Sequence, residues 1–225
     1  MMIDILRTLS VLISLAAFIY GVLAASRNGG PMYFRIVIGV AVCHLLKEMS
    51  ALVAYLCGDP VGSFTVATLA TISSVFFLLS ANYGQIDGIV DDGSTRARIK
   101  LISCVVPLLL LCSFAAFLAA GVLRNTMQII TDAAVVVLML PASYFNTKHL
   151  LMPDDEVGFL KSSRGCNIGA IVYYFLLRLQ TLAELTGPQV FSEGMRAAVS
   201  ASVVILVWMA ERGGKRWKTL ISSFL

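Results

Sequence analysis

The side chains of this sequence that could do chemistry are charged and amide groups inside long apolar stretches. Two such stretches contain His44, Lys47, Glu48, Arg178, Gln180 and Glu184. An ionised side chain in the middle of a bilayer costs about 3 kcal/mol on insertion scales, so it is rare unless it is paired or faces water. These residues are therefore the first candidates for a site that binds a charged or polar ligand.

The composition is that of an integral membrane protein. Of the 225 residues, 58% are hydrophobic and only 13% are charged, whereas soluble chains contain about 25% charged residues. Apolar stretches of about 20 residues recur along the chain, and each is long enough to cross a hydrocarbon core about 30 Å thick. Because lipid offers no partners to backbone polar groups, the stretches must be helices. The expected fold class is an all-α integral membrane protein.

The apolar stretches predict a bundle of seven transmembrane helices, separated by short breaks that contain Gly, Pro, Asn and Asp. The expected spans are 5–25, 32–57, 64–83, 101–123, 127–144, 166–185 and 195–210. Residues 1–212 then form one membrane domain. Residues 213–225 form a basic cytoplasmic tail or a link to an output partner.

The distribution of Lys and Arg predicts the orientation. Three of them, Arg7, Arg124 and Arg196, fall in the N-terminal segment and the even-numbered connections, whereas twelve fall in the odd-numbered connections and the C-terminal segment. The other two, Lys47 and Arg178, lie in the interior of spans, away from their ends. The positive-inside rule places the N-terminus outside and the C-terminus in the cytoplasm. We expect a multi-pass protein of the plasma (inner) membrane.

An internal repeat is a further expectation. When the chain is offset by 130 residues, spans two and three align without a gap on spans six and seven, with Gly39 on Gly169 and Ala67 on Ala197. This suggests a parallel 3+1+3 arrangement of two three-helix units, which some transporters have. Apolar helices also match by chance, so an arrangement without a repeat stays open.

The predicted depths bring the charged residues together. At 1.5 Å per residue, Lys47 and Glu48 lie about 4–6 Å from the centre of their span toward the exterior. Asp132 and Arg178 also fall in the exterior half of the membrane. The expected ligand-binding residues are His44, Lys47, Glu48, Asp132, Tyr174, Arg178, Gln180 and Glu184. The charges of Lys47, Glu48, Asp132 and Arg178 cancel. A closed network that only fastens the helices, with Arg178 paired to Asp132 or Glu48, is therefore an equal alternative.

The sequence contains no motif that indicates enzymatic or metal-binding chemistry. No serine-histidine-acid spacing, H-E-x-x-H, phosphate-binding glycine loop or zinc cluster is present. The five cysteines form no C-x-x-C pair and are expected to be small packing residues. We expect no catalytic residue, no metal ligand and no cofactor, and we predict that the protein is not an enzyme.

The layout of the chain resembles a known family. Seven N-out spans, a basic turn before the second span, Tyr83 at the end of the third and Pro107 in the fourth are similar to the seven-helix N-terminal sensor region of bacterial histidine kinases. That resemblance implies a bacterial sensor whose cytoplasmic partner is a kinase or regulator. No phosphoacceptor histidine or ATP-binding motif follows the last span, so we expect either a truncated sensor or a standalone relative.

Two functions follow from these observations. The first is a membrane sensor that binds a small or lipid-borne ligand in the outer-half cluster and moves its cytoplasmic end. The alternative is a small-solute transporter, coupled to protons through His44 and Glu48. A pocket open to one side favours sensing, and opening to both faces favours transport. The expected partners are membrane lipids, a small ligand, a kinase or regulator and a second copy in a homodimer, but not nucleic acid.

Overall fold

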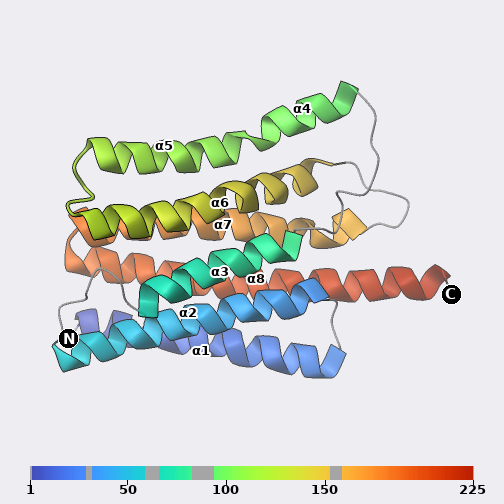
Figure 1. Cartoon of the computed structure of the whole chain (residues 1–225). Helices are drawn as coiled ribbons and strands as arrows, with labels where there is room; N and C mark the ends of the chain where they lie inside the picture. Colours follow the sequence, from blue (N-terminus) through green and yellow to red (C-terminus); the bar gives the residue numbers. More distant parts are fainter. Residues whose placement is uncertain (1, 29–31, 59–65, 83–93, 153–158, 225) are drawn as a thin grey trace.

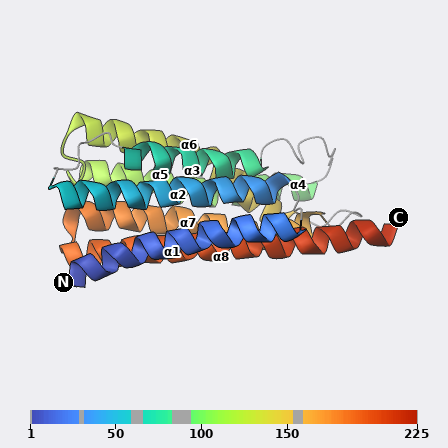
Figure 2. The ribbon, with the colours of Figure 1, turned by 90° about the horizontal axis from the view of Figure 1, so that it is seen from below.

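The computed structural model describes residues 2–28, 32–58, 66–82, 94–152 and 159–224. Within these ranges the chain forms eight helices, and consecutive long helices run in opposite directions (Figure 1). The helices are α1 (Met2–Asn28), α2 (Met32–Cys57), α3 (Val66–Asn82), α4 (Ser94–Ser103), α5 (Val105–Ala119), α6 (Thr126–Leu151), α7 (Phe159–Thr186) and α8 (Gln189–Phe224). Helices α1 and α8 lie along one side of the bundle and α3, α5 and α6 along the other, with α2 and α7 between them (Figure 2).

The lengths of the helices suit a membrane. In the described part of the chain, six helical stretches are long and apolar enough to cross a bilayer: Met2–Arg27, Met32–Cys57, Ala97–Ala119, Thr126–Leu151, Ser162–Thr186 and Gln189–Thr219. Helix α3 is apolar but has only 17 residues, about 26 Å at 1.5 Å per residue. The all-α bundle of a multi-pass membrane protein is thus confirmed, while the orientation and the repeat stay predictions. Positions 64, 65 and 83 of the expected third span lie outside the described residues.

The expected fourth span is divided into α4 and α5 at Cys104. Pro107 has no backbone N–H, and its ring takes the space next to the carbonyl four residues earlier, that of Ser103. The chain therefore tightens at Cys104, whose N–H donates to Leu101 O at 3.1 Å. It resumes with Leu108 N donating to Cys104 O at 3.0 Å.

The same span ends at Ala119, four residues before its predicted end. Gly121 has φ of +65°, a left-handed conformation that glycine adopts without steric cost. Gly121 N donates to Leu118 O at 3.1 Å and Val122 N donates to Phe117 O at 2.9 Å, which together close the helix in a Schellman motif. The helix therefore ends at a glycine inside the apolar stretch, before the end of the stretch itself.

Helices α6, α7 and α8 extend beyond the apolar stretches that predicted them. Helix α6 reaches Leu151, α7 begins at Phe159, and α8 covers Gln189–Phe224. With 36 residues, α8 is about 54 Å long and extends past the other helices at one end of the bundle (Figure 1). The backbone of the expected tail, up to Phe224, is a continuation of α8.

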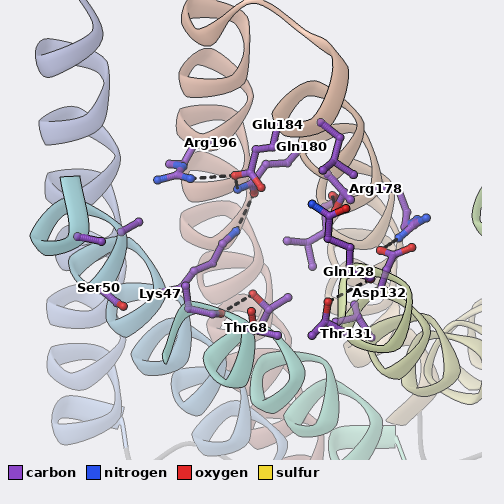
Figure 3. Close-up of a pocket in the computed structure, with 18 of the residues that line it drawn as sticks. Lys47, Ser50, Thr68, Gln128, Thr131, Asp132, Arg178, Gln180, Glu184 and Arg196 are labelled. Carbon is purple, nitrogen blue, oxygen red and sulfur yellow. Dashed lines mark hydrogen bonds and ion pairs between the residues drawn. The ribbon is translucent and has the colours of Figure 1, made fainter. Parts of the chain in front are cut away.

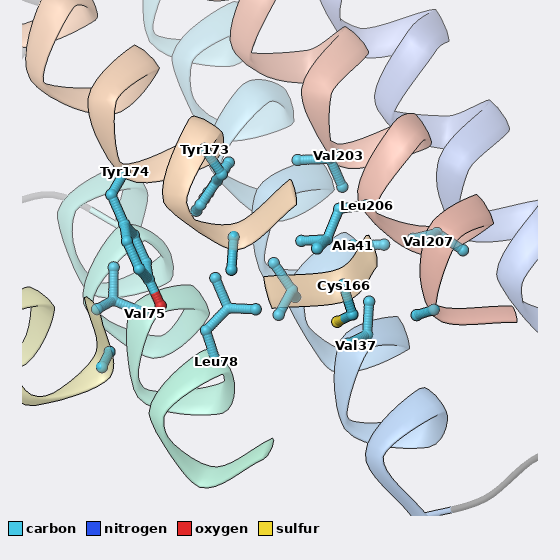
Figure 4. Close-up of a cluster of buried hydrophobic side chains, with 14 of the residues drawn as sticks. Val37, Ala41, Val75, Leu78, Cys166, Tyr173, Tyr174, Val203, Leu206 and Val207 are labelled. Carbon is cyan, nitrogen blue, oxygen red and sulfur yellow. The ribbon is translucent and has the colours of Figure 1, made fainter. Parts of the chain in front are cut away.

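The core lies where α2, α3, α7 and α8 meet (Figure 4). Its largest side chains include Tyr173 and Tyr174, whose hydroxyls are satisfied by Ser74 at 2.9 Å and Asn146 at 3.1 Å. Helices α7 and α8 approach closely at Gly213. A Cβ at this position would collide with the backbone oxygen of Ser162. This packing holds α7 and α8 against each other along most of their length.

Candidate functional site

A cavity of about 700 Å³ lies at the end of the bundle where α1 begins. Side chains from α1, α2, α3, α6, α7 and α8 line it. It reaches the surface near Tyr55 and Glu184, whose side chains are partly exposed. Its volume is within the range of small-molecule sites, roughly 300–1,000 Å³. Polar side chains gather in two groups, one around Lys47 and Arg196 and one around Asp132 and Arg178 (Figure 3).

The first group forms a continuous chain of hydrogen bonds across three helices. Lys47 Nζ of α2 donates to Gln180 Oε1 of α7 at 2.7 Å, and Gln180 Nε2 donates to Glu184 Oε1 at 2.8 Å. Arg196 Nη2 of α8 donates to the same Glu184 oxygen at 2.9 Å. This wall of the cavity therefore joins α2, α7 and α8 through charged and amide groups.

Behind that wall lies the carboxylate of Glu48, which is 1% exposed. Lys47 Nζ is 3.7 Å from Oε1, His44 Nε2 is 3.8 Å from the same atom, and Arg196 Nε is 3.9 Å from Oε2. Among the described residues, neither oxygen of Glu48 has a hydrogen-bond partner. His44 Nε2 lies 3.0 Å from Ser200 Oγ of α8. Glu48 is thus neutralised by cations of the wall at distances longer than a hydrogen bond.

A buried ion pair between α1 and α8 completes this side. Arg7 Nε donates to Glu193 Oε1 at 3.0 Å, and the guanidinium carbon of Arg7 lies 3.9 Å from the centre of the Tyr55 ring. Glu193 Oε2 also lies 3.8 Å from Arg196 Nε. These contacts connect α1 to the same network.

The second group is centred on Arg178 and Asp132, which are 3% and 8% exposed. Arg178 Nη1 donates to Asp132 Oδ1, which joins α7 to α6. Arg178 Nε donates to Ser113 Oγ of α5 at 3.0 Å, and its guanidinium carbon lies 4.5 Å from the centre of the Phe117 ring. In the described structure Arg178 Nη2 and Asp132 Oδ2 have no hydrogen-bond partner. The pair lines the cavity and retains unused hydrogen-bonding capacity.

The structure separates the eight predicted site residues into two sets. Those that line the cavity are Lys47, Asp132, Arg178, Gln180 and Glu184. His44 and Glu48 are buried against the wall, and Tyr174 lies in the core with its hydroxyl on Asn146. The pairing of Arg178 with Asp132 is one of those expected for a closed network, but the pair borders a cavity. Whether these residues bind a ligand stays a prediction.

Three charged residues of the network were not predicted: Arg7, Glu193 and Arg196. Arg7 and Arg196 fall at the edges of the expected spans 5–25 and 195–210 and were counted with the adjoining segments, whereas α1 already begins at Met2 and α8 at Gln189. The Gly187-Pro188 pair was the available signal, because proline marks the start of a helix. A helix that starts there places Glu193, Arg196 and Ser200 on one face.

The charges are arranged so that the cavity side is positive. The lining contains four cations, Arg7, Lys47, Arg178 and Arg196, against the two carboxylates of Asp132 and Glu184, which gives a formal charge of +2. Glu48 and Glu193 lie behind this surface and bring the total to zero. The network is therefore neutral as a whole but cationic toward the cavity.

Comparisons of the chain with protein-family models, curated proteins and solved structures gave no match. The resemblance to the sensor region of histidine kinases therefore rests on helix layout alone. In the part of the chain that the structure describes, no group of three His, Cys, Asp or Glu side chains could hold a metal ion.

Proposed function

We propose that the protein is a bacterial membrane receptor that binds a small ligand in this cavity and transmits its presence through α8. One observation carries the proposal. Arg196 of the cavity wall and the basic residues near the C-terminus belong to the same unbroken helix, which extends past the rest of the bundle (Figure 1). With the N-terminus outside, the cavity faces the exterior and the end of α8 faces a cytoplasmic kinase or regulator.

The cavity itself supports binding over simple fastening of helices. A network that only joins helices gains most when its charged groups are packed together and their hydrogen-bonding capacity is used. Here about 700 Å³ lies beside the network, and buried atoms of Arg178 and Asp132 have no partner among the described residues. A polar ligand that fills the cavity would lie next to this pair and to the group around Lys47 and Arg196.

The contacts of α8 suggest how occupancy is transmitted. At the cavity, α8 is joined to α7 through Arg196 and Glu184 and to α1 through Glu193 and Arg7. Toward its other end, α8 packs closely on α7, where a Cβ at Gly213 would collide with the backbone oxygen of Ser162. A ligand that favours a different arrangement of the cavity contacts would shift the balance between two positions of α8.

Transport is the second candidate, supported by His44 and Glu48. These buried groups lie 3.8 Å apart behind the cavity wall, where they could exchange a proton with a bound solute. The cavity, however, lies at one end of the described bundle, and a one-sided pocket favours a receptor. Uptake of a bound compound into proteoliposomes identifies a transporter.

Spin-label distances test the receptor proposal. We would replace the exposed Cys57, Cys104 and Cys112 and place labels at Arg98 of α4 and Lys218 of α8. Purified protein in nanodiscs would be screened with small acids, amines, alcohols and sugars. A compound that raises the melting temperature should also shift this distance, because the ligand selects one position of α8. A control pair at Arg27 and Arg98 should not shift, and a bound compound that leaves α8 unmoved contradicts the proposal.

A further inference from the structure

The cavity wall contains one carboxylate that differs from the others in its surroundings. The side chain of Glu184 is 37% exposed, whereas those of Glu48, Glu193 and Asp132 are between 1% and 7% exposed. The three buried carboxylates cannot leave their cations without a large desolvation cost. Glu184 can rotate into water at the mouth of the cavity, so it is the exchangeable anion of the network.

Glu184 occupies the position that an external anion would take. One of its oxygens accepts both from Gln180 Nε2 at 2.8 Å and from Arg196 Nη2 at 2.9 Å. Lys47 follows in the same chain through Gln180, and one of its three N–H donors is used in that bond. If the Glu184 carboxylate moves away, an amide and two cations remain to receive another carboxylate or phosphate.

The remaining lining describes the rest of the ligand. The lining also contains uncharged hydroxyl and amide groups, including Thr68, Gln128 and Thr131 (Figure 3), and the apolar side chains of Ala51 and Leu177. Such a surface fits a body that is partly apolar and carries few charges. The formal charge of +2 on the lining disfavours amines and quaternary ammonium compounds.

We propose that the ligand is an organic anion, a carboxylate or phosphate with a partly apolar body, and that its charged group displaces Glu184 from Arg196 and Gln180. This proposal rests on the receptor function and names the ligand class of the same cavity. The exchange of one anion for another keeps the network neutral. It also breaks a direct ion pair between α7 and α8, which is the step that frees α8 to move.

The test measures binding of hexanoate and hexyl phosphate to the full chain in phosphatidylcholine nanodiscs, with hexanol and hexylamine as matched uncharged and cationic probes. Glu184→Gln keeps the shape of the side chain but removes the competing charge, so it should bind both anions at least fivefold more tightly. Lys47→Met should weaken them about tenfold, the effect of one charge-assisted hydrogen bond. Arg124→Gln, at an exposed basic residue of the same end outside the cavity lining, should change nothing.

A Glu184→Gln variant that binds the anions no better than the wild type, or wild-type protein that binds hexanol as well as hexanoate, overturns the proposal. This arm stands even if Lys47→Met fails to fold. Nanodiscs that contain phosphatidylglycerol distinguish the source of the anion. Competition by this lipid identifies a headgroup as the ligand, and its absence identifies a free anion; both agree with the proposed chemistry.

The two proposals fail in different ways. If hexanol binds as well as the anions and still shifts the Arg98–Lys218 label distance, the anion site is wrong and the receptor remains. If the anions bind more tightly to Glu184→Gln but α8 does not move, the receptor is wrong and the anion site remains.

Discussion

Replacing Asp132 with alanine should destabilise the bundle, because it leaves the Arg178 guanidinium buried without its counter-charge. Removing one partner of a buried pair costs about 3–5 kcal/mol. Arg178 keeps its hydrogen bond to Ser113 Oγ at 3.0 Å and its contact with the Phe117 ring at 4.5 Å. It also lines a cavity that reaches the surface, so the cost should be at the lower end of the range, about 3 kcal/mol.

A double-mutant cycle separates the pair from the packing around it. Arg178→Met leaves the Asp132 carboxylate unpaired and should also cost about 3 kcal/mol. The double variant contains neither charge, so its loss should be smaller than the sum of the two by about 2 kcal/mol. Lys100→Met, at an exposed lysine of α4, is the control and should change stability by less than about 0.5 kcal/mol.

Unfolding by dodecyl sulfate in mixed micelles can be followed by the fluorescence of Trp208 and Trp217, which both lie on α8. The free energies of the four proteins are then compared under the same conditions. Losses that add within about 0.5 kcal/mol would show that Asp132 and Arg178 do not interact. Such a result would refute the geometry described for this wall of the cavity.

Three further predictions concern the backbone. Gly213→Ala should lower the melting temperature by several degrees, because its Cβ would meet the Ser162 carbonyl. The control Gly194→Ala has no neighbouring atom within 4 Å and should be neutral or stabilising by up to about 1 kcal/mol. Thermal unfolding in nanodiscs measures both variants. Gly121→Ala should cost about 1–2 kcal/mol at φ of +65°, and the asparagine variant should lose less in the same assay. Pro107→Ala should restore a hydrogen bond at the break between α4 and α5, seen as slower amide hydrogen exchange there; unchanged exchange would contradict the role given to this proline.

The sequence predicted the helices best where breaks and apolar stretches coincide. The bounds of α2 match the expected span 32–57 because glycine and proline lie close to both ends. The bounds of α6, α7 and α8 do not match, because hydropathy detects the part of a helix that lipid surrounds. Backbone hydrogen bonding continues into polar flanks, and the helix ends where the local backbone geometry stops it, as at Gly121.

The charged residues around the cavity were predicted only in part, because the sequence marks a charge only where it interrupts an apolar stretch. Lys47 and Arg178 stand out because a charge in an apolar stretch is costly and needs an explanation. Arg7, Glu193 and Arg196 lie near the ends of their helices, where charged residues are ordinary in a membrane protein, so nothing in their composition marks them. Their pairing depends on how α1, α2, α7 and α8 pack, which apolar periodicity does not specify.

From the sequence, the charged residues could either fasten the helices or bind a ligand. The arrangement of their charges is compatible with one network that does both. A cavity lined only by cations would be costly to form, because each charge loses solvation without a partner. Glu48 and Glu193, fully buried behind Arg196, provide the opposite charge. With that charge permanently in place, the proposed ligand needs to displace only Glu184. The same carboxylates that hold the helices together would thus keep the cavity ready for an anion.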